Sequence, residues 1–167
     1  MVTPRIVDGD LLDQKVEVIV NAWNRNIIPW WLLLPQGVSG TIKRRAGLQP
    51  FFELGRMGAI PLGGAVKTSA GRLPFKAIIH VAGISMFWRS SKKSIQDSAI
   101  SALSLADAHQ FKSVAFPVIG AGTGGYGEDG ALQMMVEALD PLDSPASVTI
   151  VRFQKTATRK ANYAADH

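Results

Sequence analysis

The sequence predicts an α/β fold: a three-layer α/β/α sandwich with a mixed, mostly parallel central sheet. Two observations support this. Short β-branched and apolar runs recur along the chain, and most are almost continuously apolar, as in strands that are buried on both faces. Segments with the apolar spacing of helices lie between these runs, and strands that alternate with helices are typical of a parallel sheet.

The predicted strands are marked by β-branched composition. The run VEVIV, residues 16–20, is β-branched and has the alternating character of a strand at its start. The six strands are expected at residues 5–7, 16–20, 65–69, 77–81, 113–119 and 147–153.

The helices are predicted from apolar residues that repeat every three or four positions. They are expected at residues 38–46, 92–110 and 129–139. Ser90 or Ser91 is expected to cap the second helix, and Glu128 or Asp129 the third.

Length and composition limit the possible classes of protein. The chain has 167 residues, of which 47% are hydrophobic and 19% charged, so we expect one globular domain over residues 1–155 and a frayed tail over residues 156–167. It contains no cysteine, which excludes disulfides, thiolate metal sites and cysteine nucleophiles. Its three histidines are scattered, so we expect neither a metal site nor a cofactor.

Charge and hydropathy bear on localisation and partners. The N-terminal residues lack the pattern of a signal peptide, and the longest apolar stretch, IIPWWLLLP, is far shorter than the ~20 residues of a membrane span. We therefore expect a soluble, cytoplasmic protein with no membrane partner. The net charge of +5 indicates either a solvated basic surface or attraction to an anionic partner. The basic clusters lack interleaved aromatic residues, which gives nucleic-acid binding little support.

A glycine-rich loop is the strongest functional signal. The segment FPVIGAGTGGYGEDG, residues 116–130, joins a predicted strand to a predicted helix. Successive backbone N–H groups of such a loop surround phosphate oxygens, and the helix N-terminus adds partial positive charge. The loop predicts binding of a small molecule that bears a phosphate or diphosphate. A second loop of this kind, residues 35–40, also precedes a helix.

Polar residues follow two predicted strands. Asn21 and Asn24 come after the VEVIV strand, where open α/β sheets bind ligands. Their amides suit ribose hydroxyls, or they shape a turn at the end of the strand. Asp10 follows the first strand, and its carboxylate suits an exocyclic amine such as that of adenine, or it binds its own backbone in a turn.

Together these segments resemble the macrodomain family of ADP-ribose-binding modules, over about residues 5–153. Five segments match the family's pattern in order: VDGDL, VEVIVNAWN, GVSGTIKRRAG, GGAVKTSAGRLPFKAIIHVAG and FPVIGAGTGGYG. The resemblance implies that Asp10 binds adenine, that Asn24 binds the distal ribose, and that Gly122 and Gly125 lie on the phosphate loop. Phe153, at the end of the last strand, is expected to stack on adenine.

The full set of ligand-binding residues follows from the loops and from this resemblance. It comprises Asp10, Leu11, Asn21, Asn24, Gly37, Val38, Ser39, Gly120, Ala121, Gly122, Thr123, Gly124, Gly125, Tyr126 and Phe153.

The chain departs from the family's pattern at three places. Ser39 occupies the position of an aspartate that many family hydrolases use, and a hydroxyl is no resting general base at neutral pH. Gly124 replaces an aromatic residue, and the bulky IIPWWLLLPQ replaces a run of glycines. Trp30 and Trp31 in that segment either fill the core or cover the ligand.

Three further residues have specific expectations. His80 lies in an apolar strand and is expected to be a core histidine with its hydrogen bonds satisfied. Lys43, four residues after Ser39, is expected to face solvent, although it is placed to approach an anion. Glu128 is expected at a helix start, and it is also a carboxylate close to the phosphate loop.

The sequence therefore predicts a protein that binds ADP-ribose, free or attached to a macromolecule. The alternative is an ADP-ribosyl hydrolase that acts on modified protein, nucleic acid or a small ester without the usual aspartate. Its candidate catalytic residues are Ser39, Asn24 and Glu128. A nonspecific basic nucleic-acid binder is the third class.

Overall fold

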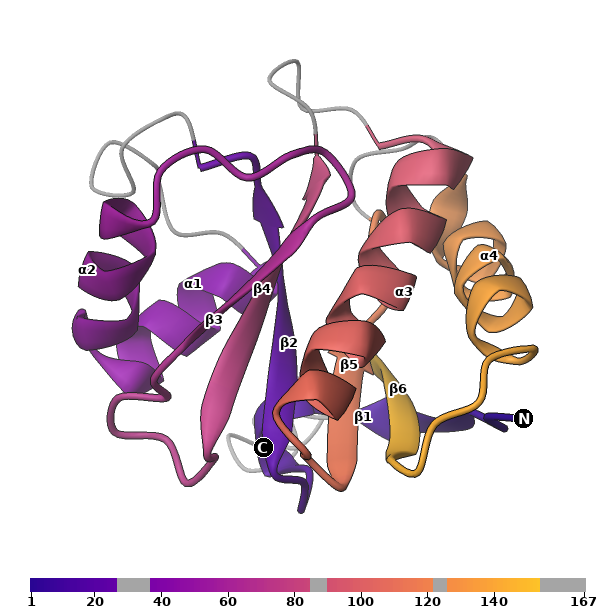
Figure 1. The fold of residues 1–167 in the computed structure, drawn as a ribbon, viewed down its shortest axis with the longest axis horizontal. Coiled ribbons are helices and arrows are strands. Elements are labelled where there is room, and N and C mark those ends of the chain that lie inside the picture. The colour runs from indigo at the N-terminus through magenta and orange to yellow at the C-terminus, as the bar shows by residue number, and fades with distance from the viewer. Residues whose placement is uncertain (27–36, 85–89, 122–125, 154–167) are drawn as a thin grey trace, which may run out of the picture.

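A six-stranded sheet forms the centre of the molecule, and helices cover both of its faces (Figure 1). The structure is a computed structural model, and it describes residues 1–26, 37–84, 90–121 and 126–153. Trp30, Trp31, the loop residues 122–125 and the tail 156–167 lie outside the described residues.

The elements follow one another in the alternating order that the sequence predicts. The strands are β1 (Arg5–Gly9), β2 (Val18–Asn24), β3 (Ala65–Thr68), β4 (Ala77–Ile84), β5 (Ser113–Pro117) and β6 (Ser147–Phe153). The helices are α1 (Gly37–Ala46), α2 (Gln49–Arg56), α3 (Lys92–Ala108) and α4 (Gly127–Leu139), with a short 3-10 helix η1 (Leu11–Asp13).

The sheet has the order β1-β6-β5-β2-β4-β3. All neighbouring strands are parallel except β3, which pairs antiparallel with β4 at one edge. The prediction of a mixed, mostly parallel sheet is confirmed.

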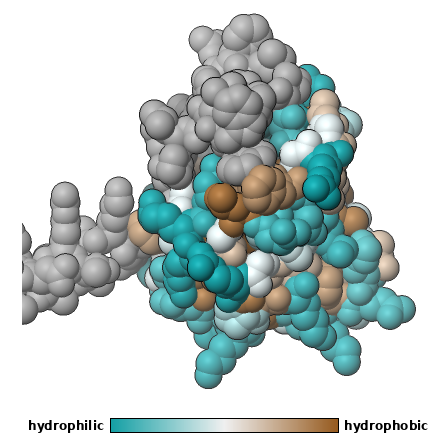
Figure 2. All heavy atoms as spheres, turned by 90° about the vertical axis from the view of Figure 1, so that its left-hand side faces the viewer, coloured by the Kyte–Doolittle hydropathy of each residue, from teal (hydrophilic) through white to brown (hydrophobic). Residues whose placement is uncertain are grey.

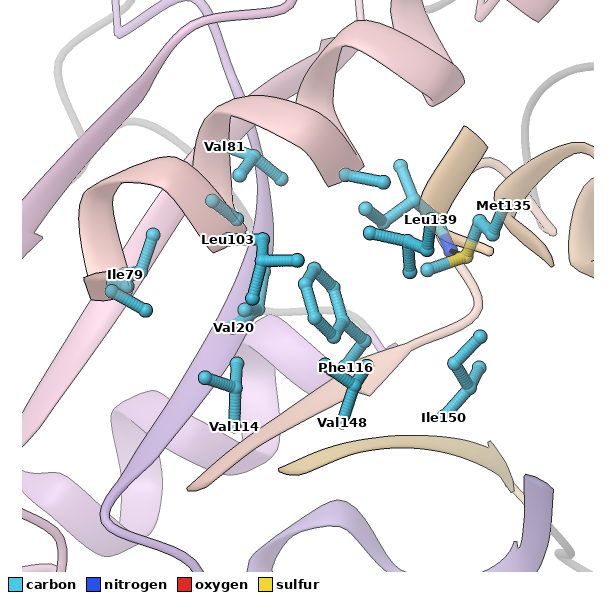
Figure 3. Close-up of a cluster of buried hydrophobic side chains, with 14 of the residues drawn as sticks. Val20, Ile79, Val81, Leu103, Val114, Phe116, Met135, Leu139, Val148 and Ile150 are labelled. Atoms are coloured by element: carbon cyan, nitrogen blue, oxygen red, sulfur yellow. Dashed lines mark hydrogen bonds between the residues drawn. The ribbon is translucent and has the colours of Figure 1, made fainter. Parts of the chain in front are cut away.

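Two hydrophobic cores lie on the two faces of the sheet. On one face, α3 and α4 pack against side chains such as Val20, Phe116 and Ile150 (Figure 3). On the other, α1 and α2 pack against side chains such as Ile19 and Ile78. Because successive strand residues point to opposite faces, a strand covered on both sides must be apolar at nearly every position, which explains the continuous apolar runs.

The capping predictions had mixed outcomes. Ser91 caps α3 in a reciprocal arrangement with Ser94, as predicted. The prediction for α4 was wrong: the helix begins at Gly127, its N-cap is Tyr126 without a capping side chain, and Glu128 lies in the first turn. The carboxylates there still suit the helix dipole, since they lie near its positive end.

Helix α2 was not predicted. It has only eight residues, with Pro50 in its first turn, and it buries Phe51 and Leu54. Figure 2 views the molecule from the α1 and α2 side, where hydrophobic groups lie among hydrophilic ones; Phe52 on α2 is 49% exposed. The helix is too short for its apolar spacing to stand out from a loop, so packing on the sheet determines it.

None of the helices in the described parts of the chain has the length and apolar character that crossing a membrane requires.

Candidate functional site

Several of the predicted site residues lie at one edge of the sheet. Because β1, β6, β5 and β2 are parallel neighbours, their carboxyl ends lie at the same edge. Two of these strands end at predicted site residues, β6 at Phe153 and β2 at Asn24. The other two are followed directly by predicted site residues, β1 by Asp10 and β5 by the turn at residues 118–121. The first turn of α1 contacts β2 through Ser39, which lies against Asn21 and Ala22. The first turn of α4 lies near the end of β6, because Asp129 pairs with Arg152.

Asp10 and Phe153 lie beside each other at the β1–β6 end of this edge. Gly9, the residue before Asp10, is the register partner of Phe153, whose side chain is 48% exposed. Asp10 caps η1, and its Oδ1 accepts a hydrogen bond of 2.9 Å from the Leu12 N–H. The turn interpretation of Asp10 is therefore confirmed for one oxygen, and no hydrogen bond within the described residues occupies the other.

Leu11, the next predicted ligand-binding residue, is 3% exposed and belongs to the core beneath α1 and α2. Its side chain therefore packs in this core and holds in place the turn that follows β1.

An arginine supplies positive charge near this end of the edge. Arg152, one residue before Phe153, forms an ion pair of 2.8 Å with Asp8 and a longer one of 3.8 Å with Asp129 on α4. The hydrogen bond to Asp8 is the main reason that the pKa of Arg152 is raised. Glu128, next to Asp129, is exposed.

The turn after β5 approaches the start of α3 closely. Gly120 has φ +84°, and a Cβ at this position would lie 2.7 Å from Cδ1 of Ile95. Glycine is required here both by the left-handed backbone and by the lack of space. The Ala121 N–H donates to the Val118 carbonyl at 3.4 Å.

The centre of the predicted phosphate loop, Gly122, Thr123, Gly124 and Gly125, lies outside the described residues. Tyr126, at the other end of the loop, is 42% exposed.

Asn24 ends β2 and is almost buried, with 9% exposure. Its Oδ1 accepts a hydrogen bond of 2.7 Å from the Asn26 N–H, so the turn-shaping interpretation is confirmed for this oxygen. Asn26, which the sequence analysis did not single out, has φ 58°, and its amide donates to the carbonyls of Leu54 and Gly58. Asparagine tolerates this left-handed backbone, which was the signal available in the sequence.

Asn21 lies inside the sheet and not beyond it. The prediction ended this strand at Val20, whereas β2 continues to Asn24 and Asn21 is fully buried. A polar residue was read as the end of the strand, but its amide is satisfied by buried partners. Its Nδ2 lies 3.0 Å from Nδ1 of His80, and its Oδ1 accepts a hydrogen bond of 2.7 Å from Oγ of Ser39.

His80 is a satisfied core histidine, as predicted. It is fully buried, and its Nε2 lies 2.8 Å from Oγ1 of Thr68. Burial lowers the pKa of His80 to about 3, so the ring is neutral at physiological pH. Thr68 was not singled out in the sequence.

Ser39 lies in the first turn of α1, after Gly37 and Val38, and is half-buried. Its Oγ lies within donating distance of two acceptors, Oδ1 of Asn21 at 2.7 Å and the Ala22 carbonyl at 3.1 Å. A neutral hydroxyl is too weak a base to take up a proton at neutral pH, and neither an amide oxygen nor a backbone carbonyl can deprotonate it, which agrees with the expectation from sequence.

Lys43 is half-buried rather than facing solvent as expected. Its Nζ lies 5.0 Å from the ring centre of Phe51 and 5.9 Å from that of Trp23. Burial lowers the pKa of Lys43. The aromatic side chains that pack α1 and α2 on the sheet attract this ammonium group.

Comparisons with known proteins agree with this architecture. The family profile described as Macro domain matches residues 20–135. An O-acetyl-ADP-ribose deacetylase of Citrobacter rodentium is 34% identical over 166 residues, which cover 92% of this chain and 90% of that protein. A protein of the same name from Escherichia coli K12 is 36% identical, with 80% of this chain and 76% of that protein covered.

Solved structures show the same fold. A point mutant of the Oceanobacillus iheyensis macrodomain with ADPR superposes with a TM-score of 0.72 at 25% identity, covering 97% of this chain and 93% of that one. The Trypanosoma brucei macrodomain in complex with ADP-ribose, at 22% identity and a TM-score of 0.70, shares the fold over 96% of this chain and 68% of its own. With the profile match over more than half of its length, this chain belongs to the macrodomain family.

Proposed function

We propose that this protein binds ADP-ribose, free or attached to a macromolecule, at the carboxyl edge of its parallel strands. The observation that supports this is the order of groups along the edge. Asp10 and Phe153 follow β1 and β6, the glycine turn follows β5, and Asn24 ends β2. ADP-ribose has the same order of parts: adenine, diphosphate and distal ribose.

Strand spacing supports the match in length. Neighbouring strands lie about 4.8 Å apart, so β1 and β2, separated by two strands, are about 14 Å apart. An extended dinucleotide-like ligand spans such a distance, whereas a single phosphate or a free base does not.

The adenine end is assigned to Asp10 and Phe153. The Asp10 carboxylate has one oxygen engaged by Leu12, and the other is proposed to accept from the exocyclic amine of adenine. Guanine presents a carbonyl at the equivalent position, which a carboxylate repels. The exposed ring of Phe153 provides a stacking surface beside Asp10.

The diphosphate is assigned to residues 120–126. Gly120 turns the chain back at the end of β5, and α4 directs its N-terminus to the same edge. Backbone N–H groups and a helix N-terminus bind phosphate oxygens without a metal.

Calorimetric titration with ADP-ribose, ADP and GDP tests this assignment. The parent should bind ADP-ribose most tightly and GDP least, with little change between two salt concentrations, whereas nonspecific nucleic-acid binding falls steeply with salt. Gly122→Glu should abolish binding of ADP-ribose, because it introduces an anion where the phosphates bind.

Gln133→Glu adds the same charge on the exposed surface of α4 and should leave binding intact. Unchanged affinity in a folded Gly122→Glu protein would place the phosphates elsewhere.

Hydrolysis is the second candidate function, because the relatives at 34–36% identity are named O-acetyl-ADP-ribose deacetylases. The contacts of Ser39 argue against its use as a general base, whose absence typically costs about 10²–10⁴ in rate. We expect little release of acetate from O-acetyl-ADP-ribose by the parent, and more by Ser39→Asp.

Turnover by the parent that persists in Ser39→Ala would direct the search to Asn24 or Glu128. Turnover that disappears in Ser39→Ala would make Ser39 catalytic.

A further inference from the structure

A buried chain of hydrogen bonds connects Ser39, at the proposed site, to the opposite side of β4. It runs from Ser39 through Asn21 and His80 to Thr68, with distances of 2.7, 3.0 and 2.8 Å. Asn21, His80 and Thr68 are each at most 1% exposed. This hydrogen-bond chain joins residues of three strands, β2, β4 and β3, and of the helix α1. Its members lie up to 59 residues apart in sequence.

The far end of the chain has a fixed acceptor. The Thr68 hydroxyl lies 2.9 Å from the backbone carbonyl of Ser69, to which it donates. Thr68 has one hydroxyl proton, and the Ser69 carbonyl can only accept. The arrangement that makes both contacts hydrogen bonds directs the Thr68 proton to that carbonyl and has Nε2–H of His80 donate to Oγ1. Ser69 is itself held, since its N–H donates to Glu53 at 3.1 Å and its hydroxyl donates to the same carboxylate.

The proton on Nε2 of His80 determines the direction of the other hydrogen bonds in the network. A neutral histidine with its proton on Nε2 has a lone pair on Nδ1, which accepts from the Asn21 amide nitrogen. The Asn21 carbonyl then faces Ser39 and accepts the Ser39 proton. The second neighbour of that hydroxyl, the Ala22 carbonyl, is also an acceptor, so the Ser39 proton points into the protein and its lone pairs remain for a ligand.

The chain is not a catalytic triad, although it contains a serine and a histidine. Asn21 separates them, and an amide neither takes up nor passes on a proton at neutral pH. The histidine therefore orients the asparagine, and the asparagine orients the serine.

We propose that Thr68, His80 and Asn21 are positioning residues that make Ser39 a hydrogen-bond acceptor for a hydroxyl group of the ligand's distal ribose. This inference rests on the proposed binding of ADP-ribose. It also assigns a specificity: the group that faces Ser39 must be a donor, so a ribose with a free hydroxyl is preferred to one that is esterified at that oxygen.

The first test is the tautomer of His80, read from two-bond ¹H–¹⁵N correlation spectra of the full-length protein. The protein has three histidines, and the His80→Gln variant identifies which signals belong to His80. We expect the neutral Nε2–H form between about pH 5 and pH 8. The Nδ1–H form would reverse the amide of Asn21 and overturn the proposal.

The second test compares ADP-ribose with ADP, which lacks the distal ribose. Ser39→Ala should lower the affinity for ADP-ribose about threefold to tenfold, the equivalent of one neutral hydrogen bond. It should leave the affinity for ADP unchanged. Thr68→Val removes the acceptor for Nε2–H with little change in shape. It should shift His80 toward the Nδ1–H form and lower the affinity for ADP-ribose by a similar factor. The affinity for ADP should again be unchanged.

A double-mutant cycle distinguishes positioning from general stabilisation. If Thr68 acts through Ser39, Thr68→Val should have no further effect on ADP-ribose in the Ser39→Ala background. The matched control is Thr149→Val on β6, a strand threonine for whose hydroxyl the described structure gives no hydrogen bond. It should change neither ligand's affinity.

The outcomes separate this inference from the proposed function. A parent that binds neither ADP-ribose nor ADP would contradict the proposed function. A parent that binds both, with additive effects of Thr68→Val and Ser39→Ala or with equal losses for the two ligands, would contradict the positioning role alone. If Thr68→Val fails to fold, the tautomer of His80 in the parent still decides the polarity of the chain.

Discussion

Acidification should destabilise this protein through the buried side chain of His80. Both ring nitrogens of His80 have partners, Thr68 at Nε2 and Asn21 at Nδ1. In the arrangement proposed above, Nε2–H donates to Thr68 and Nδ1 accepts from Asn21. A proton added to Nδ1 would face the amide N–H of Asn21, and the charge would be buried without a counter-ion among the described neighbours. Burial of the charge is the cause of the lowered pKa of His80, and the clash with the Asn21 amide belongs to the proposed tautomer.

The magnitude follows from the difference between the two states. The pKa of His80 falls from its ordinary value of 6.5 to about 3 in the fold. Because the folded pKa is the lower one, stability is complete above pH 6.5 and is lost as the pH falls toward 3, by about 1.4 kcal/mol per pH unit. Between about pH 7.5 and pH 5 the loss should reach about 2 kcal/mol.

Urea denaturation of the parent and of His80→Gln at these two pH values measures this contribution. The glutamine keeps an amide donor for Thr68 but does not titrate, so its free energy of unfolding should fall by about 2 kcal/mol less than that of the parent. His109→Gln, a change at an exposed histidine, is the control. Glu17, whose pKa is lowered chiefly by its hydrogen bond from Lys76, loses stabilisation only below its ordinary value of 4.5.

The reasoning would be refuted if the parent and His80→Gln showed the same dependence on pH. That result would mean that the folded protein accommodates a protonated His80.

Three further predictions concern the edge and the core. Asp10→Ala should weaken the binding of ADP-ribose by about 1–3 kcal/mol, the range for a hydrogen bond to a charged group, and should reduce the preference for ADP-ribose over GDP. Calorimetry in which Asp10→Ala binds ADP-ribose as tightly as the parent would exclude this role for Asp10. Gly120→Ala should destabilise the fold by more than Gly127→Ala, because both have positive φ but only Gly120 has Ile95 within 2.7 Å of the added Cβ; the excess, measured in urea, should be about 1–3 kcal/mol, and equal losses would contradict the contact. Ser98 Oγ is buried and has no partner within the described residues, so Ser98→Ala should leave the melting temperature unchanged or raise it, and a clear fall would reveal a partner.

Much of the fold could be predicted because its signals are local. Strands that are covered on both faces must be apolar at nearly every position, and this leaves runs that are visible in a single sequence. The cap of α3 and the helical spacing within it are likewise local, and both predictions were confirmed. Helix α2 was missed because eight residues with a proline and a glycine carry too little periodicity, and its stability comes from burying Phe51 and Leu54 on the sheet.

For the candidate site, the sequence alone placed Asp10, Asn24 and the glycine turn at the ends of strands. Parallel strands bring such ends together whatever the details of packing. Gly120 is one position where composition and structure agree closely, since its left-handed backbone and its contact with Ile95 both require glycine.

The tertiary structure alone decided what the polar residues do. Asn21 looked like the end of a strand, yet it lies inside β2 because His80, 59 residues away, satisfies its amide. Ser39 was recognisable only as a missing aspartate, and the acceptor role proposed for it depends on contacts that begin at Thr68. Such roles depend on strand register and helix docking, which join residues distant in the chain, and the free energy of a buried polar group depends on those partners rather than on its neighbours in sequence.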